Sequence, residues 1–419
     1  MKKIITVLIS AILILTVGLA SACTPIQGGN FKPPSTPFVS DSIEAGDNVK
    51  FNYLLESDRQ LLTKVQVAEK VKNSVVALEM IIDEGGTLSE GSGSGVIVDV
   101  DLYDGNNKID DDNEFYVITC HHCIEGATEV TVYVPDAEGD NFTDDDYNVD
   151  YAFSGVVVGS NPASTADLTL VGGDQGSDLA VLKIRVPDSI KSNIVEAKIM
   201  DTSLHSISVA EDILAIGNPG GLSPGSVRAG VVSYIGREGY LEETGMLEMV
   251  QMDAQTNHGD SGGAAFNMYG ELIGINNAGN DDLNGVNFFI PLTTSKINQG
   301  VITIVKQLIG TKTTSNFGFV SGRWRKGFTV TTSGDTVVVK TVGSALYAKG
   351  LRKGDILVSI QHGIQIRSTS TVADYYNAME ELKESVQLGD TIKYTFRRGN
   401  AQDVITTTAT QYTFGYADA

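Results

Sequence analysis

The sequence predicts a mostly β protein with more than one domain. Forty-five of its 419 residues are glycine and only 7% are aromatic, which suits a chain with many tight turns. From residue 74 onward, short β-branched runs alternate with Gly and Asp turns, as in antiparallel sandwiches or barrels. A chain of 419 residues exceeds one ordinary hydrophobic core, so two or three domains are expected.

The distribution of charge separates the C-terminal part from the rest. Residues 311–411 carry 13 basic and 8 acidic residues, a net charge of +5, whereas the whole chain has −22. So acidic a protein is a poor partner for nucleic acid, whose phosphates require Lys and Arg. The contrast predicts that residues 311–411 form a unit of their own.

The N-terminus has the pattern of an export signal over residues 1–23. Two lysines precede an apolar run of 16 residues, which is too short to favour a spanning helix. Small residues directly before Cys23 resemble the bacterial lipobox, although Ala20 stands where Leu is commonest. We therefore expect lipidation of Cys23 and an anchor at the extracellular face of the bacterial cell membrane. Ordinary cleavage, giving a secreted protein, is the alternative.

The next segments are predicted from composition and periodicity. Residues 24–55 begin rich in Pro, Gly, Ser and Asn and are expected to be a linker. Apolar residues at helical spacing predict a helix over 57–72, with Leu61 and Val65 on its buried face. Strands are expected at residues 75–82, 95–98, 115–119 and 129–134.

Two acidic inserts interrupt these strands. Residues 99–114 and 136–150 each hold seven carboxylates, and we interpret both as solvated hairpin tips. The first faintly resembles a calcium loop, but its glycine, Gly105, falls at position seven, whereas the calcium loop needs position six. Calcium binding remains the alternative.

Candidate catalytic chemistry centres on Ser261, which has glycines at 259, 262 and 263 around it. Glycine allows a sharp backbone bend and leaves room for an incoming carbonyl. The N–H groups of Gly259 and Ser261 could hold a developing oxyanion, but the serine needs a His base and a carboxylate. A Gly-Ser loop without chemistry is the alternative.

Candidates for those partners precede Ser261. His121 and His122 end an apolar strand, and Asp178 comes directly before another. The spacings from His122 to Asp178 and from Asp178 to Ser261 are 56 and 83 residues. The order His, Asp, Ser is that of the chymotrypsin fold and differs from that of subtilisin and the α/β-hydrolases.

Several motifs together resemble the HtrA/Deg family of serine proteases. They are Thr119-Cys-His-His-Cys123, Ser177-Asp-Leu-Ala-Val-Leu182, Ala215-Ile-Gly-Asn-Pro-Gly-Gly-Leu222, Gly230-Val-Val-Ser233, Gln251-Met-Asp-Ala254 and Gly270-Glu-Leu-Ile-Gly-Ile-Asn276. The resemblance covers residues 64–411 and implies a chymotrypsin-like double six-stranded β-barrel at 56–310. It implies His122 as base, Asp178 as its orienting carboxylate, Ser261 as nucleophile, and Gly259 and Ser261 as oxyanion donors.

The chain shows three departures from related proteases. Asn257-His258-Gly259-Asp260 replaces the common Asn-Pro-Gly-Asn, and no Ile-Val-Gly-Gly activation segment follows a basic cleavage site. Asp260 is therefore expected to lack a freed N-terminus as its partner. Cys120-His121 replaces the usual Asn-Asn before the catalytic His.

The run Cys120-His121-His122-Cys123 holds four metal-ligating residue types. Neighbours along a strand point to opposite faces, so we expect no metal site here. No organic cofactor is implied either. A Cys120–Cys123 disulfide is an alternative to two free thiols outside the cell.

The expected substrate pocket is uncharged. Gln255 lies six residues before Ser261, where trypsin-like enzymes that cut after Arg or Lys keep an Asp. The resemblance implies a preference for small aliphatic residues such as Val or Ala before the cut. The pocket residues expected are Gln255, Thr256, Asn257, Ile275, Asn276 and Asn277.

A helix over residues 294–309 is expected to close the protease domain. Residues 343–360, the helix 372–385 and residues 389–396 resemble a PDZ domain, placed at 311–411 before a tail at 412–419. The resemblance implies that Phe317, Gly318, Phe319 and Val320 bind the carboxylate of peptide C-termini. A spacer that binds nothing is the alternative.

Together these observations predict an exported, ATP-independent serine endopeptidase that cleaves misfolded or exposed protein segments. The resemblance also implies a homotrimer, built through the N-terminal segment that contains Phe51 and Tyr53. A chaperone or PDZ scaffold that binds unfolded chains without cutting them is the rival hypothesis.

Overall fold

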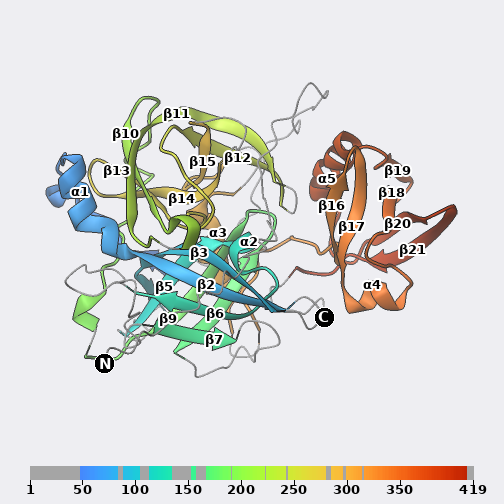
Figure 1. Cartoon of the computed structure of the whole chain (residues 1–419), viewed down its shortest axis with the longest axis horizontal. Coiled ribbons are helices and arrows are strands. Elements are labelled where there is room, and N and C mark those ends of the chain that lie inside the picture. The colour runs from blue at the N-terminus through green and yellow to red at the C-terminus, as the bar shows by residue number, and fades with distance from the viewer. Residues whose placement is uncertain are drawn as a thin grey trace, which may run out of the picture.

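The computed structural model describes residues 48–83, 88–103, 113–134, 152–156, 167–189, 191–221, 223–241, 244–279, 285–295, 299–313 and 316–412. Two bodies of strands pack together, and a third β domain lies to one side of them (Figure 1). The predicted signal peptide, Cys23, most of the linker and most of both acidic inserts fall outside these residues. No helix within the described ranges is long and apolar enough to cross a membrane.

The first body is a sheet of seven antiparallel strands in the order β7-β6-β2-β3-β5-β9-β8. The strands are β2 (Val75–Asp83), β3 (Leu88–Val98), β5 (Glu114–Cys120), β6 (Ala127–Tyr133), β7 (Ala152–Val156), β8 (Leu168–Asp174) and β9 (Leu179–Arg185). All four strands predicted from the sequence are present.

The second body is a closed six-stranded barrel in the order β10-β11-β12-β15-β14-β13. Its strands are β10 (Asp212–Gly217), β11 (Ser226–Leu241), β12 (Gly245–Met252), β13 (Ala264–Asn267), β14 (Leu272–Gly279) and β15 (Asn287–Pro291). The expected double barrel is thus one closed barrel and one seven-stranded sheet, whose end strands β7 and β8 do not pair with each other within the described residues. The residues of both bodies share one hydrophobic core.

The ordered domain begins before the predicted start at residue 56. Strand β1 (Val49–Phe51) pairs with β4 (Val100–Leu102), and Phe51 is 6% exposed in the core. The linker prediction is therefore wrong for residues 49–51. Because Phe51 packs inside its own domain, it cannot supply a trimer contact.

The N-terminal helix is shorter than predicted. A 3₁₀ turn, η1 (Glu56–Asp58), is followed by α1 (Lys64–Val71), which Thr63 caps by accepting a hydrogen bond from the N–H of Gln66. This capping box fixes the start of the helix after residue 63. Leu61 and Val65, which we placed on the buried face, are 72% and 66% exposed.

The closing helix is displaced toward the C-terminus. Helix α3 (Val301–Thr311) has Gly300 as its N-cap and continues past Gly310, the expected stop. It packs against β8 and β9, with Ile304, Val305 and Leu308 buried in the common core.

The C-terminal domain has its own sheet and core. Its strands are β16 (Phe328–Ser333), β17 (Thr336–Val342), β18 (Ile356–His362), β19 (Gln365–Ser368), β20 (Thr391–Arg398) and β21 (Ala401–Thr408). Helices α4 (Ser344–Ala348) and α5 (Val372–Ser385) complete it. Phe328, Tyr375 and Tyr394 lie in a core separate from that of the barrels. The arrangement is consistent with the PDZ domain expected from the sequence.

The predicted carboxylate-binding loop at residues 317–320 is contradicted by the structure. Phe317 and Val320 are buried in the core of the barrels, at 6% and 2% exposure. The N–H of Gly318 donates to the carbonyl of Val171 at 2.7 Å, so this segment continues the edge of β8. Residues 316–320 therefore pack with the two bodies of strands and not with the C-terminal sheet.

Candidate active site

His122 and Asp178 meet where two neighbouring strands change direction. Cys120, the last residue of β5, is paired with Leu179, the first residue of β9. The helical turn α2 (His121–Ile124) follows Cys120 directly. His122 Nδ1 lies 2.7 Å from Asp178 Oδ2, and Asp178 Oδ1 accepts the His122 backbone N–H at 2.9 Å. Two bonds to one carboxylate fix both the position and the tautomer of the imidazole.

The charged forms of Asp178 and His122 stabilise each other. Burial alone would raise the pKa of Asp178, but the charge and hydrogen bonds of His122 outweigh burial and lower it. Burial would lower the pKa of His122, but the Asp178 carboxylate and then Cys123 raise it well above its ordinary value. Asp178 is thus ionised and ready to stabilise an imidazolium.

Asn277 holds Asp178 from the other barrel. Its Nδ2 donates to Asp178 Oδ2 at 2.6 Å, and its backbone carbonyl accepts the Ser261 hydroxyl at 2.7 Å. The sequence placed Asn277 in the substrate pocket. Its position on β14 instead lets one residue contact both the nucleophile and the orienting carboxylate.

Ser261 lies in the loop between β12 and β13, beside the turn that carries His122. The Ser261 carbonyl accepts a hydrogen bond from Cys123 Sγ at 3.4 Å, which joins the two segments. His122 Nδ1 faces Asp178, so Nε2 is the ring nitrogen left for the serine. The hydroxyl must rotate away from the Asn277 carbonyl to reach it.

The backbone around Gly259 is oriented to bind an oxyanion. The His258 carbonyl accepts a hydrogen bond from the Gly220 N–H at 2.6 Å, so the N–H of Gly259 points the opposite way across the trans peptide. Gly259 has φ of 91°, and a Cβ there would lie 2.2 Å from the Asn218 carbonyl oxygen. Ser94 Oγ donates to the Gly259 carbonyl at 2.7 Å and secures the other side of the residue.

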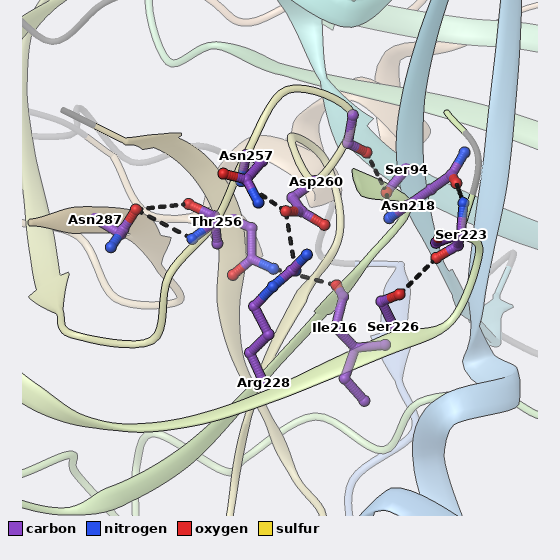
Figure 2. Close-up of polar contacts among 12 residues, drawn as sticks. Ser94, Ile216, Asn218, Ser223, Ser226, Arg228, Thr256, Asn257, Asp260 and Asn287 are labelled. Atoms are coloured by element: carbon purple, nitrogen blue, oxygen red, sulfur yellow. Dashed lines mark hydrogen bonds and ion pairs between the residues drawn. The ribbon is translucent and has the colours of Figure 1, made fainter. Parts of the chain in front are cut away.

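Asp260 pairs with Arg228 within the second barrel (Figure 2). Its side chain is 1% exposed, and Oδ2 lies 3.0 Å from Arg228 of β11 and accepts the Asn257 N–H at 2.7 Å. Burial nevertheless raises the pKa of Asp260, because it outweighs these two interactions. Sequence reasoning foresaw no freed N-terminus but missed Arg228. The sequence signal for such a partner was Asp260 itself, because a buried carboxylate requires a cation beside it.

The residues predicted to line the substrate pocket differ in exposure and in their partners. Gln255 and Asn257 are exposed, and Thr256 donates its N–H and hydroxyl to Asn287 Oδ1, both at 3.1 Å (Figure 2). Ile275 is buried in the barrel core, and the Asn276 amide donates to the carbonyls of Ile216 and Ala264. The side chains of Ile275 and Asn276 are therefore taken up by the barrel and do not face a substrate.

The cluster at residues 120–123 differs from the strand that we expected. Because the chain turns into α2 after Cys120, donor atoms of Cys120, His122 and Asp178 lie within 4.8 Å of one another. We argued against a metal site because neighbouring residues of a strand point to opposite faces, and this argument is wrong at His122. His122 and Asp178 nevertheless already bond to each other. Cys120 and Cys123 are free thiols, and His121 points away to the Tyr412 hydroxyl.

A serine, a histidine held by a buried aspartate and an oriented Gly-x-Ser loop between two β bodies define a chymotrypsin-like serine protease site. A sequence model of the trypsin-like peptidase domain matches residues 93–275. The chain is 30% identical over 280 residues to the periplasmic pH-dependent serine endoprotease DegQ of Escherichia coli, covering 65% of this chain and 50% of DegQ. It is 38% identical over 142 residues to the serine endoprotease DegS of Haemophilus influenzae, covering 33% and 39% of the two chains. Residues 93–275 therefore match a trypsin-like peptidase domain, and the chain is similar to serine proteases of the HtrA/Deg type.

Solved structures of similar proteins extend over more of the chain. A serine endoprotease from Yersinia pestis aligns over 84% of this chain and 100% of its own, with 23% identity and a TM-score of 0.43. The HtrA-type protease AlgW aligns over 84% and 97%, with 21% identity and a TM-score of 0.44. By sequence, the chain spans about half the length of the curated relatives it matches.

Proposed function

We propose that this protein is an exported, ATP-independent serine endopeptidase in which Ser261 is the nucleophile. The observation that carries the proposal is the His122–Asp178 pair at 2.7 Å, set beside a Ser261 loop whose Gly259 peptide is already oriented. The pair supplies the base, and the loop supplies donors where negative charge develops.

The reaction follows from this geometry. Ser261 Oγ turns from the Asn277 carbonyl to His122 Nε2, loses its proton and attacks the substrate carbonyl. The N–H groups of Gly259 and Ser261 stabilise the oxyanion, and His122 then protonates the leaving amine. Water hydrolyses the acyl-enzyme with His122 as base again, and this chemistry requires no cofactor.

The substrates we propose are misfolded or exposed protein segments cut after small aliphatic residues. Gln255 carries no charge, so an Arg or Lys at the first substrate position gains no ion pair there. Peptides ending in Val before the cut should be cleaved faster than matched peptides with Arg. The opposite ranking would refute this specificity.

Peptide C-termini are proposed to bind at the C-terminal domain, in a groove other than residues 317–320. PDZ-like sheets bind peptides by adding them as a strand, and the domain has its own core on which to do so. Fluorescence anisotropy with random-C-terminus peptides would test this, and binding that survives amidation of the terminus would contradict it.

Anchoring through lipidated Cys23 and assembly into a homotrimer complete the proposal. The supporting features are the lipobox-like signal and the exposed apolar residues Leu55, Leu61 and Val65 near the N-terminal side of the domain. Mass spectrometry would show a lipid on Cys23. Light scattering that finds a monomer would remove the trimer.

The decisive experiment compares β-casein cleavage by the chain from Thr24 with that by its Ser261→Ala variant. Cleavage by the parent alone supports the endopeptidase. Protection of unfolded protein from aggregation by both proteins, with cleavage by neither, supports the chaperone hypothesis.

A further inference from the structure

Two free thiols flank the catalytic histidine. Cys120 is the N-cap of α2 and Cys123 is its third residue, so His121 and His122 form the centre of a Cys-x-x-Cys turn. Side chains at the N-cap and third positions of a helix approach each other, as they do in a capping box. Both sulfur atoms also lie against the Ser261 loop and its neighbour Asn276, since Cys123 Sγ is 3.4 Å from the Ser261 carbonyl and Cys120 Sγ is 3.3 Å from the Asn276 carbonyl. Nothing in the proposed protease mechanism uses them.

We propose that Cys120 and Cys123 are an oxidation site, which a small peroxide converts into a disulfide that removes a negative charge from beside His122. More of His122 is protonated in the dithiol form, and more of it is neutral and able to act as a base in the disulfide form. The consequence for cleavage rests on the proposed function, whereas the disulfide itself does not.

The surroundings of the sulfur atoms allow the bond to form. Cys120 Sγ donates to the Asn276 carbonyl at 3.3 Å, and Cys123 Sγ donates to the Ser261 carbonyl at 3.4 Å. Each carbonyl also accepts a backbone N–H, from Gly262 at 2.8 Å and Ser94 at 2.9 Å respectively. The Cys123 proton, and on oxidation both S–H groups, can therefore be lost without leaving either carbonyl acceptor unsatisfied.

The reactive thiol is Cys123. The hydrogen bond from Cys120 outweighs burial and, together with the charge of His122, lowers the pKa of Cys123 to about 5. Burial raises the pKa of Cys120 well above its ordinary value, so the proton stays there. A thiolate at Cys123 is the nucleophile that such oxidation requires.

The size of the oxidant follows from burial. Cys123 is 6% exposed and Cys120 is fully buried, so a bulky disulfide cannot approach in line with a sulfur. Hydrogen peroxide can. The Cys123 thiolate attacks one peroxide oxygen, the O–O bond breaks, and the leaving hydroxide takes the proton of the His122 imidazolium and departs as water. The Cys120 sulfur then attacks the sulfenic acid at Cys123, forming the S–S bond and releasing a second water. Peroxide is reduced by two electrons and the dithiol is oxidised by two.

The charge around His122 gives the modification its effect. The charged and titratable groups that face the imidazole are Asp178 from the turn before β9 and Cys123 from α2, and Cys120 of β5 and His121 lie next to them. Asp178 raises the pKa of His122 in both redox forms. The Cys123 thiolate raises it further only in the dithiol form, and the protonated imidazole cannot accept the Ser261 proton.

The first test counts thiols in the chain from Thr24, which keeps every described residue and no other cysteine. After tris(carboxyethyl)phosphine, denaturation and alkylation should label both cysteines. After hydrogen peroxide in EDTA they should label neither, and the intact mass should fall by two hydrogens. Two labelled cysteines after peroxide, or a sulfinic acid at Cys123 with Cys120 still labelled, would overturn the proposal.

The second test measures the pKa of His122 by NMR of histidine-labelled protein, assigned with the Ser261→Ala chain and independent of turnover. Peroxide should lower this pKa by about one unit, which corresponds to about tenfold more neutral base below the pKa. The acid limb of kcat/KM should move by the same amount. Cys123→Ser should show the low pKa with either reagent, and Cys120→Ser should form no disulfide.

The outcomes separate the two proposals. Equal His122 pKa values in the reduced and oxidised chains overturn the oxidation site, whatever the activity. A chain that forms the disulfide and shows the His122 shift but cleaves nothing in either form overturns the proposed protease function and supports the oxidation site.

Discussion

Replacing Arg228 by Met removes the cation that Asp260 contacts at 3.0 Å and leaves the carboxylate with the Asn257 N–H. Breaking a fully buried ion pair costs about 3–5 kcal/mol. Arg228 is 22% exposed, so solvent already screens part of this interaction, and we expect a cost of about 2–3 kcal/mol. For a domain of this size, that lowers Tm by about 4–12 °C.

The same change should disturb the oxyanion loop. Asp260 lies between Gly259 and Ser261. If its unpaired carboxylate moves toward solvent, the backbone N–H groups of both neighbours are displaced. Losing one such donor costs about 10²–10³ in kcat. We expect a fall of up to about a hundredfold in kcat for a peptide ester, with a smaller change in KM.

The pH dependence has a definite sign. The folded pKa of Asp260 is raised, so the neutral carboxyl stabilises the fold at low pH, and this stability is lost as pH rises through the folded pKa. Without Arg228 that pKa rises further, so Arg228→Met should lose stability with rising pH more steeply than the parent.

Thermal unfolding and ester hydrolysis, measured on the same preparations, check this reasoning. Arg228→Lys, which keeps the charge, should retain most stability, and Asp260→Asn in the Arg228→Met background should recover part of the lost Tm. If Arg228→Met unfolds at the parent temperature and hydrolyses the ester at the parent rate, Arg228 does not hold this loop.

Three further changes test separate parts of the site. Asn277→Ala removes the 2.6 Å bond to Asp178 and should lower kcat/KM about tenfold. The pH dependence of kcat/KM measures this effect, and an acid limb that stays at the parent position would contradict the prediction. Gly259→Ala should abolish cleavage while circular dichroism stays native, because the new Cβ meets the Asn218 carbonyl; full activity would show that the loop adapts. A chain ending after residue 311 should lose about 3–6 kcal/mol against one ending after residue 320, since Phe317 and Val320 leave the core. Chemical denaturation measures this difference, and equal midpoints would refute it.

The residues of the proposed triad could be singled out in the sequence because each has a local signature. Ser261 has its glycines, and Asp178 and His122 adjoin apolar strands that proved to be β9 and β5. Arg228 and Asn277 have no such signature. They lie 32 and 99 residues from the carboxylates they bind, and the closure of the barrel and the packing of two β bodies bring them there.

Two errors in the sequence analysis have physical causes in tertiary structure. Residues 317–320 carry a plausible loop pattern, but the edge of β8 offers the Val171 carbonyl and an apolar surface, so the segment packs there. Residues 120–123 were interpreted as a continuing strand. The turn of α2 instead brings Cys120 and Cys123 together, which strand periodicity cannot reveal.

The two halves of the site are held by different parts of the molecule. On the base side, Arg323 lies 3.4 Å from Asp174 in the turn that leads to Asp178, and Tyr412 contacts His121. These residues border the C-terminal domain at its entry and exit, and they contact the segments that carry His122 and Asp178. On the oxyanion side, Arg228 and Gly220 hold the loop from within the second barrel.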